Sequence, residues 1–462
     1  MKNNSNTAPL SFIEKVGYGV GDMASNFYMG FFNIFLLYYY VDVWGISPTG
    51  AATMFLVTKI IDAVSDPAMG MIADRTETKW GKYRPYLLWM ALPFAFLGYL
   101  LFLGPDLSQS GKLIFAYVSY SLIMLAYTAI NVPYSALLAV ISPVSEERTK
   151  ATQYRFIFAS LGTLVIGASA KPLVDFLGGG DELLGFRLTI ILFAILSVLL
   201  FFFTFVSTKE RIRPVKHKTS VREDVNVLMK NTSWIILAAS SILIVVGLVA
   251  RISSTAFFTK YNMMYGEEKV LWWMDHTTLI ITCGFVGQLL GALITPYLLK
   301  FLDKRRLMIL MNLLFAGSIF MTYFIPIDQF LTILFSYSIG IFAFGVIITL
   351  LFSMYTDCSE YGEFISGHNS AGLTISASMF SLKFGSAVGS AIPGYILGWY
   401  GFVKDLPQTE MVLEGINMSW NIIPAIFFIL TAILMLFYKL DGETMKNVEE
   451  QLLERRGENL QG

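Results

Sequence analysis

The sequence predicts an all-α membrane protein with twelve transmembrane helices in two six-helix bundles. Composition is the first reason, because 55% of the residues are hydrophobic, only 14% are charged and the mean hydropathy is +0.62. A soluble domain carries about 25% charged residues, so the low fraction indicates a lipid-facing surface. The second reason is a series of long apolar segments, and the third is a polar stretch that divides this series in the middle.

Each predicted span has about 20 mostly apolar residues, the length a helix needs to cross a hydrocarbon core of about 30 Å. The spans are expected at 17–41, 49–73, 85–104, 113–142, 153–177, 186–206, 233–262, 276–299, 307–325, 330–356, 371–400 and 418–438. The expected domains are an N-terminal bundle over 1–206, a linker over 207–232, a C-terminal bundle over 233–438 and a tail over 439–462. Repeated halves of this kind are typical of transporters that rock about a central site.

Lysine and arginine are concentrated in alternate loops, and this sets the expected orientation. The basic loops include 75–84, 148–150 and 300–306, together with the linker. Because basic loops stay in the cytoplasm, we expect these loops and both termini on the cytoplasmic side of a cell inner membrane. Since residues 1–12 are polar, no cleavable signal peptide is expected.

Span two contains the ionisable residues Lys59, Asp62 and Asp66, spaced by three and four positions. This spacing places them on one face of a helix. Charges at membrane depth are costly and are candidates for function, although a static ion-pair cluster that fixes helix packing is the alternative. The two carboxylates, with Ser65 beside them, suit Na⁺ binding or an exchangeable proton, while Lys59 keeps them ionised.

Span eleven contains Lys383 in a stretch, 376–390, that is rich in Gly and Ser. Small residues allow helices to approach closely, so Lys383 is predicted to reach Asp62 and Asp66 across the bundle interface. A lysine that competes with an incoming cation for these carboxylates is a simple coupling device. The alternative is a structural salt bridge between the bundles, and the two roles are compatible.

Polar groups on four other spans predict a site for a hydroxyl-rich ligand. The candidate substrate-binding residues are Asp22, Asn26, Asn131, Ser135, Arg155 and Arg251. Hydrogen bonding between helices explains any single amide or hydroxyl equally well, and Arg155 lies close enough to a span end to reach the surface. Arg251 lies deeper, so it is expected either to bind an acidic group of the ligand or to pair with Asp22.

Several motifs resemble those of the glycoside–pentoside–hexuronide:cation symporters, a family with the major facilitator fold. They occur in order through nearly the whole chain: Tyr18-Gly19-x-Gly21-Asp22, Asp62-Ala63-x-x-Asp66-Pro67, Trp80-Gly81-Lys82-Tyr83-Arg84-Pro85, Asn131-x-Pro133-Tyr134, Asp357-x-x-Glu360-Tyr361-Gly362-Glu363 and Lys383. The resemblance implies that the chain imports a sugar or glycoside (a pentoside, hexoside or hexuronide) together with H⁺ or Na⁺ by alternating access.

The resemblance also implies individual roles. The implied cation ligands and their neighbours are Asp62, Asp66, Ser65, Thr128 and Lys383. Arg155 matches an arginine of the family's sugar site, whereas Asn26 and Asn131 stand where the best-known member has aspartates. Ser65 and Ser135 replace an asparagine and a tryptophan of that member. The loss of one carboxylate from the cation site favours H⁺ over Na⁺, and the other departures leave the particular sugar open.

Other functions are less well supported by the sequence. No nucleophile, metal cluster or catalytic histidine constellation indicates an enzyme, and no phosphate-binding Gly-x-x-x-x-Gly-Lys-Ser/Thr loop indicates an ATP-driven pump. A symporter of lysolipids or other amphiphiles with the same fold is the main alternative. The expected partners are a small sugar or glycoside, the coupling cation and the bilayer, with no nucleic acid, no cofactor and a monomer as the functional unit.

Overall fold

The computed structural model describes residues 9–142, 144–211, 228–263, 270–366, 371–404 and 406–458. Within these residues the fold is all-helical, and extended structure is limited to the isolated bridges Thr78–Gly81 and Leu271–Met274. The first group of helices is α1 (Phe12–Phe31), α2 (Pro48–Arg75), α3 (Arg84–Trp89), α4 (Ala91–Leu101), α5 (Gln109–Ile141), α6 (Ser145–Gly178) and α7 (Glu182–Ser207). The second group is α9 (Thr232–Phe257), α10 (His276–Leu298), α11 (Lys304–Phe324), α12 (Phe330–Ser366), α13 (Ala371–Trp399), α14 (Glu410–Asn417) and α15 (Ile423–Met435), followed by α16 (Gly442–Glu458).

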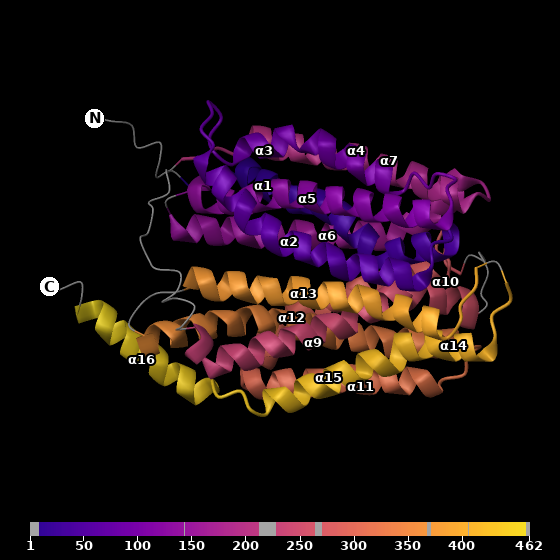
Figure 1. Ribbon diagram of the computed structural model, residues 1–462. Coiled ribbons are helices and arrows are strands. Elements are labelled where there is room, and N and C mark those ends of the chain that lie inside the picture. The colour runs from indigo at the N-terminus through magenta and orange to yellow at the C-terminus, as the bar shows by residue number, and fades with distance from the viewer. Residues whose placement is uncertain are drawn as a thin grey trace.

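The two groups form two layers whose long helices share one axis, with α1–α7 above and α9–α15 below (Figure 1). The layers, called here the N half and the C half, meet along α2 and α13 and along α6 and α10. Helix α16 and the start of α1 lie at one end of the molecule, which we call the linker end (Figure 1). The opposite end contains Asp42 and is called the Asp42 end.

Eight helical segments within the described residues are long and apolar enough to cross a membrane. They are Gln109–Ile141, Lys150–Gly178, Glu182–Ser207, Thr232–Asn262, His276–Leu298, Lys304–Phe324, Phe330–Ile365 and Glu410–Met435. Helices α1, α2, α4 and α13 are not in this set. Three of these four carry the charged residues singled out in the sequence, namely Asp22 on α1, Asp66 on α2 and Lys383 on α13.

Local sequence explains where two helices depart from the expected spans. Helix α1 begins at Phe12, before residue 17, because Ser11 and Glu14 form a reciprocal capping box at its start. The span expected over 85–104 is broken at Met90 into α3 and α4. Pro93 has no N–H to donate to the carbonyl of Trp89, so the helical hydrogen-bond ladder is interrupted at that point.

Short π-helical turns continue two helices to the Asp42 end. The turns η2 (Phe32–Leu36) and η3 (Tyr39–Val43) follow α1, and η4 (Phe258–Asn262) follows α9. A fourth such turn, η5 (Met418–Ile422), joins α14 to α15. Wide turns of this kind redirect side chains and are frequent at functional sites. They bring η3 and η4, which belong to opposite halves, into contact through their side chains.

Glycine residues allow α13 to lie close to α2. A Cβ atom added at Gly394 would lie 2.8 Å from the carbonyl oxygen of Pro48, and one at Gly398 would lie 2.4 Å from Cγ2 of Thr49. Both distances are shorter than a side chain tolerates, so only glycine permits this approach. The close packing holds the two halves together on the side where Lys383 faces α2.

Candidate cation and substrate site

Asp66 and Lys383 form an ion pair between α2 of the N half and α13 of the C half. The other carboxylate oxygen of Asp66 accepts a hydrogen bond of 2.9 Å from the hydroxyl of Thr128 on α5. Ser65 donates to the same hydroxyl over 3.4 Å. The Asp66 and Lys383 side chains remain 30% and 36% exposed, so solvent or a small ligand can reach this pair.

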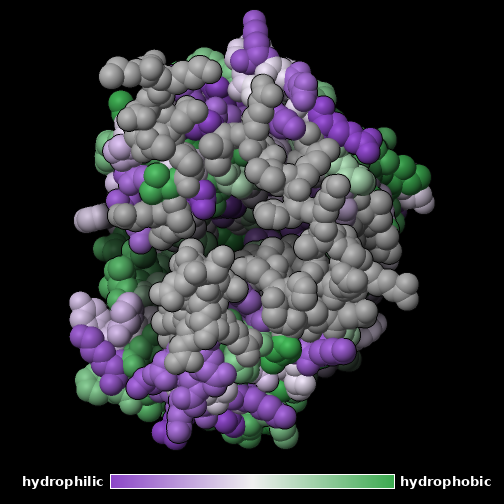
Figure 2. Space-filling model, turned by 90° about the vertical axis from the view of Figure 1, so that its left-hand side faces the viewer, coloured by the Kyte–Doolittle hydropathy of each residue, from purple (hydrophilic) through white to green (hydrophobic). Residues whose placement is uncertain are grey.

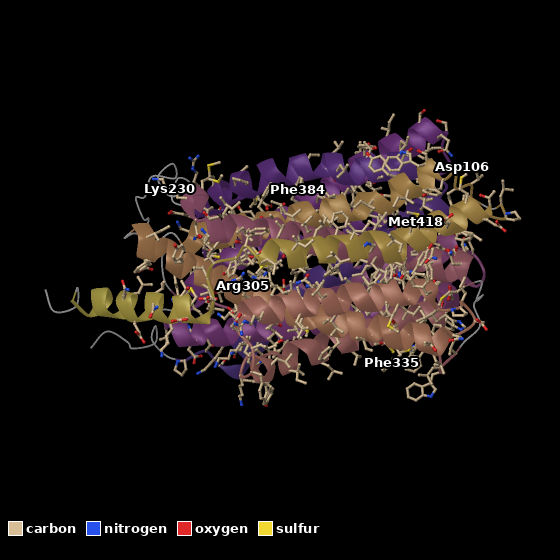
Figure 3. All side chains as sticks on the ribbon, turned by 90° about the horizontal axis from the view of Figure 1, so that it is seen from below. Asp106, Lys230, Arg305, Phe335, Phe384 and Met418 are labelled. Carbon is tan, nitrogen blue, oxygen red and sulfur yellow. The ribbon has the colours of Figure 1, made fainter. Side chains whose placement is uncertain are left out.

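The pair lies far from both ends of the helices. Phe384, the neighbour of Lys383, lies about midway along α13 in Figure 3, between Lys230 at the linker end and Asp106 at the Asp42 end. A charge pair at this depth is costly to keep in a hydrocarbon environment unless it has a function or a compensating network. One hydroxyl and one ammonium are the partners that the described residues offer to Asp66.

Two residues predicted for this site, Lys59 and Asp62, belong to the α2 backbone, but their side chains lie outside the described part of the chain. Their contribution to cation binding therefore stays a prediction. In the described ranges, no three His, Cys, Asp or Glu side chains are grouped closely enough to hold a metal ion.

Arg155 on α6 and Asp22 on α1 form a second charge pair within the N half. Arg155 Nε lies 3.3 Å from one oxygen of Asp22, and Nη2 lies 3.4 Å from the other. The Arg155 Nη1 atom is 3.5 Å from the hydroxyl of Ser135, and its guanidinium lies 5.0 Å from the ring centre of Tyr134. This two-point contact fixes the guanidinium plane, while both charged side chains stay partly exposed.

The predicted amides lie in the same region of the N half. Asn26 donates to the backbone carbonyl of Asp22 over 2.8 Å. Asn131 accepts a hydrogen bond of 3.1 Å from Ser25, and its amide nitrogen donates to the Tyr127 carbonyl over 3.2 Å. Ser25 was not among the predicted residues, because a lone serine in an apolar span carries no distinctive signal.

Helix α5 connects the two charge pairs. Thr128 contacts Asp66, Asn131 contacts Ser25, and Ser135 contacts Arg155, at spacings of three and four residues. This spacing places the three side chains on one face of α5. Seven residues of α-helix rise by about 10 Å, which is the length of a disaccharide, so the face spans the distance between the charge pairs.

Arg251 does not join this group. It is 1% exposed and lies inside the C half, with its guanidinium carbon 4.3 Å from the Trp420 ring centre and 5.0 Å from that of Tyr337. Its Nε and Nη1 atoms have no hydrogen-bond partner among the described residues. The alternative pairing of Arg251 with Asp22 is wrong, since the partner of Asp22 is Arg155. A sequence pattern cannot show which face of α9 is turned away from the other half.

A second pair between the halves, at the Asp42 end, was missed in the sequence. Lys260 on η4 lies 2.5 Å from the Asp42 carboxylate on η3, and the Tyr261 hydroxyl donates to the same carboxylate. Lys260 also donates to the Tyr38 hydroxyl over 2.9 Å, and that hydroxyl donates to Glu182 over 3.0 Å. The only hint in the sequence is that Lys260 is one of few basic residues in the sparsely charged loops.

The linker end is marked by charge pairs within the N half, and hydrophilic side chains border it above and below (Figure 2). Glu147 at the start of α6 lies 2.9 Å from Lys15 and 3.0 Å from Lys150, and it accepts the Leu10 backbone N–H over 2.9 Å. Hydrogen bonds from Lys15 and Lys150 lower the pKa of Glu147 from 4.5 to about 2. This cluster fixes Leu10 and the start of α1 to α6.

Known proteins give a consistent family assignment. The family model described as MFS/sugar transport protein matches residues 17–442. The chain is 33% identical over 449 residues to the "Inner membrane symporter YicJ" of Escherichia coli (strain K12), covering 96% of this chain and 95% of that protein. It is 33% identical over 444 residues to the "Isoprimeverose transporter" of Lactiplantibacillus pentosus, covering 95% and 90% of the two chains.

Solved structures give the same fold. A bacterial homologue of the human lysosomal transporter Spinster, in an inward-facing and occupied conformation, aligns with a TM-score of 0.66 at 13% identity, over 92% of this chain and 95% of that one. This likeness concerns the fold alone, and together with the family match it confirms an all-helical major facilitator fold without testing the predicted count of twelve spans. The relatives confirm the predicted resemblance and identify a multi-pass inner-membrane transporter instead of an enzyme. The chain belongs to the MFS/sugar transport protein family.

Proposed function

We propose that this chain is a cation-coupled symporter that imports a neutral sugar or glycoside across the inner membrane. The observation that carries the proposal is the Asp66–Lys383 pair, which joins the two halves at mid-depth and stays accessible. The family match and the symporter and isoprimeverose-transporter names of its relatives support sugar and cation as the transported pair. The same names do not favour the lysolipid alternative.

The coupling step follows from competition for one carboxylate. In the absence of the cation, Lys383 neutralises Asp66 and links α13 to α2. A cation that binds Asp66 removes the attraction for Lys383, so the two helices are free to separate or slide. Binding of sugar and cation together then favours the conformational change, because each lowers the cost of releasing the interface.

We favour H⁺ over Na⁺ as the coupling cation. A Na⁺ ion needs several oxygen ligands, whereas the described groups around Asp66 supply its own oxygens and the hydroxyls of Thr128 and Ser65. Asn131 is neutral, so it contributes no further charge on this face of α5. A proton needs only one carboxylate, and among the described side chains Asp66 supplies one within reach of Lys383.

We place the sugar between the two charge pairs, along the α5 face that contains Asn131. The amides of Asn26 and Asn131 and the Arg155 guanidinium donate hydrogen bonds to hydroxyl groups, as sugar recognition requires. The two cations at the ends of this region are each paired with a carboxylate, and Arg251 is enclosed in the C half. A neutral sugar therefore fits better than a hexuronide. The carboxylate of a hexuronide would find the cation at each end of the region already paired with an aspartate.

We also propose the full membrane arrangement, with twelve spans in two bundles, 1–206 and 233–438, joined by a cytoplasmic linker. The four spans beyond the eight apolar helices are α1, α2, α3 with α4, and α13. Helix α4 is apolar but only 11 residues long, whereas α1, α2 and α13 carry the charged residues Asp22, Asp66 and Lys383. The basic loops at the linker end support a cytoplasmic location for that end and for both termini. The functional unit is a monomer, because the proposed site is complete within one chain.

Uptake into proteoliposomes tests the function. Radiolabelled isoprimeverose, a neutral glucoside and the matching glucuronide are offered with an inward pH gradient, an inward Na⁺ gradient or neither. We expect accumulation of a neutral glycoside above its outside concentration with the pH gradient, and collapse when a protonophore is added. Accumulation of the glucuronide in preference to the glucoside would overturn the neutral-substrate proposal, and equilibration without accumulation under both gradients would overturn symport.

A further inference from the structure

A pocket of about 460 Å³ opens at the Asp42 end, between the two halves and apart from the sugar and cation site. The N half contributes the start of α2 and the start of α5, and the C half contributes the loop after α13. The lining residues are Val41, Gly45, Ile46, Ser47, Pro48, Gln109, Ser110, Leu113, Phe402, Val403 and Lys404. The pocket therefore exists only while the two halves are together at this end.

Two lysine ammonium groups from opposite halves converge on this pocket. Lys404 Nζ donates to the carbonyl of Val43 over 2.6 Å, and Lys112 Nζ donates to that of Trp44 over 2.7 Å. A Cβ atom at Gly45 would lie 3.9 Å from Lys404 Nζ and 4.0 Å from Lys112 Nζ. Gly45 has a φ of +77° and no side chain, so the space between the two ammonium groups stays open.

The backbone adds further positive potential at the same place. Helices α2 and α5 both begin at the pocket, and their N-termini carry partial positive charge. The Ser47 side chain makes no capping hydrogen bond to the first turn of α2, and this leaves the N–H groups of Thr49 and Gly50 without that cap. The start of α5 differs, because Ser108 accepts the Gly111 N–H there. The neighbouring carboxylate of Asp42 is directed to Lys260 and Tyr261.

Apolar side chains continue from the pocket onto the outer surface. Leu113 and Phe402 line the pocket itself. Ile114, Trp399 and Leu406 are large, apolar and exposed. Ile114 follows Leu113 on α5, Trp399 ends α13, and Leu406 lies in the loop after α13. A ligand with a charged head and an apolar body matches this combination, whereas a free anion uses only the lysines.

We propose that this pocket binds the phosphate of an anionic phospholipid from the leaflet at the Asp42 end. The phosphate lies between Lys112 and Lys404, and the acyl chains lie against the apolar residues outside. Because the two lysines belong to different halves, the bound lipid stabilises the conformation in which this end is closed. The inference is independent of the transported sugar and of the coupling cation.

The alternative role for both lysines is only to cap carbonyl groups at the end of η3. The following experiment distinguishes carbonyl capping from lipid binding. Thermal unfolding of purified protein in detergent is followed with phosphatidylglycerol, with phosphatidylcholine of the same chains and with inorganic phosphate. We expect phosphatidylglycerol alone to raise Tm, by about 3 °C. The rise should be lost in Lys112→Gln and Lys404→Gln, restored in Lys112→Arg, and unchanged in Lys300→Gln at the linker end.

Native mass spectrometry supplies a second readout that does not depend on stability. One retained phosphatidylglycerol per wild-type chain, and none in Lys112→Gln, supports the site. Equal Tm shifts with both lipids, or a phosphate shift as large as the lipid shift, would overturn the lipid proposal. The lipid proposal would also be overturned if the glutamine variants lost the same amount of Tm in every lipid, because the lysines would then only cap backbone carbonyls.

Discussion

Among the described residues, two Lys–Asp pairs join the halves of this molecule, and their carboxylates differ in accessibility. At mid-depth, the side chains of Asp66 and Lys383 are 30% and 36% exposed. At the Asp42 end, the Asp42 side chain is 2% exposed and is held by Lys260 and Tyr261. An accessible carboxylate can exchange partners, whereas a sealed one with several partners cannot do so without local opening. We therefore propose that the same chemistry serves coupling at Asp66 and closure at Asp42.

The largest expected effect comes from removing the exchangeable carboxylate. Asp66→Asn should reduce gradient-driven accumulation to the equilibrium level, because the amide neither binds a cation nor attracts Lys383. Exchange of sugar across the membrane should persist, since the Asp22–Arg155 pair is untouched. Asp106→Asn, an exposed aspartate at the Asp42 end, is the control and should accumulate normally. Normal cation-dependent accumulation by Asp66→Asn would show that Asp66 is not the coupling carboxylate.

The next effect tests the partner of that carboxylate. Lys383→Ala should change the apparent affinity for the coupling cation by about tenfold, because the competitor for Asp66 is gone. The measurement is the dependence of initial uptake rate on cation concentration, normalised to protein in the membrane. Lys230→Ala, an exposed lysine at the linker end, should behave as wild type. An unchanged cation dependence together with normal accumulation would make Lys383 a bystander.

A smaller effect should follow from weakening the Asp42–Lys260 pair, whose carboxylate is buried. Asp42→Asn removes the charge that Lys260 and Tyr261 share, so the Asp42 end should open more often. Hydrogen exchange of the η3 and η4 backbones should speed up by about tenfold, as expected for the loss of a charge-assisted hydrogen bond. The cation dependence of uptake should stay as in wild type. A shifted cation dependence with unchanged exchange would reverse the roles given to the two pairs.

The smallest effect is expected at the Glu147 cluster, which lies within the N half and does not connect it to the C half. Glu147 has its pKa lowered from 4.5 to about 2, so its ionised form stabilises the fold above pH 4.5 and this contribution is lost as pH falls towards 2. Glu147→Gln should lower Tm by about 3 °C at pH 7. The difference from wild type should shrink as pH falls below 4.5, while sugar uptake per folded protein stays constant. A pH-independent difference would show that charge is not the cause.

The sequence predicted the elements of the site better than their partners. The spacing of Asp62 and Asp66 and the small residues around Lys383 predicted the contact between α2 and α13. The glycines that allow this contact are Gly394 and Gly398, whereas Gly385 and Gly389 near Lys383 pack against α9. The capping box at Ser11 and the helix break caused by Pro93 are local signals that explain the shifted boundaries. Such features depend on residues within one turn of each other, so they are readable along the chain.

Contacts between distant segments were not readable in the same way. Asp42 and Lys260 are separated by 218 positions, and no local pattern links them. Arg251 looked like a ligand for an acidic sugar, yet α9 turns it towards Trp420 and Tyr337 inside the C half. The rotation of a helix about its axis depends on packing from all its neighbours, which one sequence does not specify.

Infrared difference spectroscopy tests most directly whether the coupling proton binds at Asp66. Spectra of reconstituted protein are compared before and after addition of a transported sugar, at a pH where uptake is active. The account predicts a protonated-carboxyl band that appears with sugar in wild type and in Asp106→Asn, and that is absent in Asp66→Asn. A band of full intensity in Asp66→Asn would contradict the central claim, because the proton would then be held by another carboxylate.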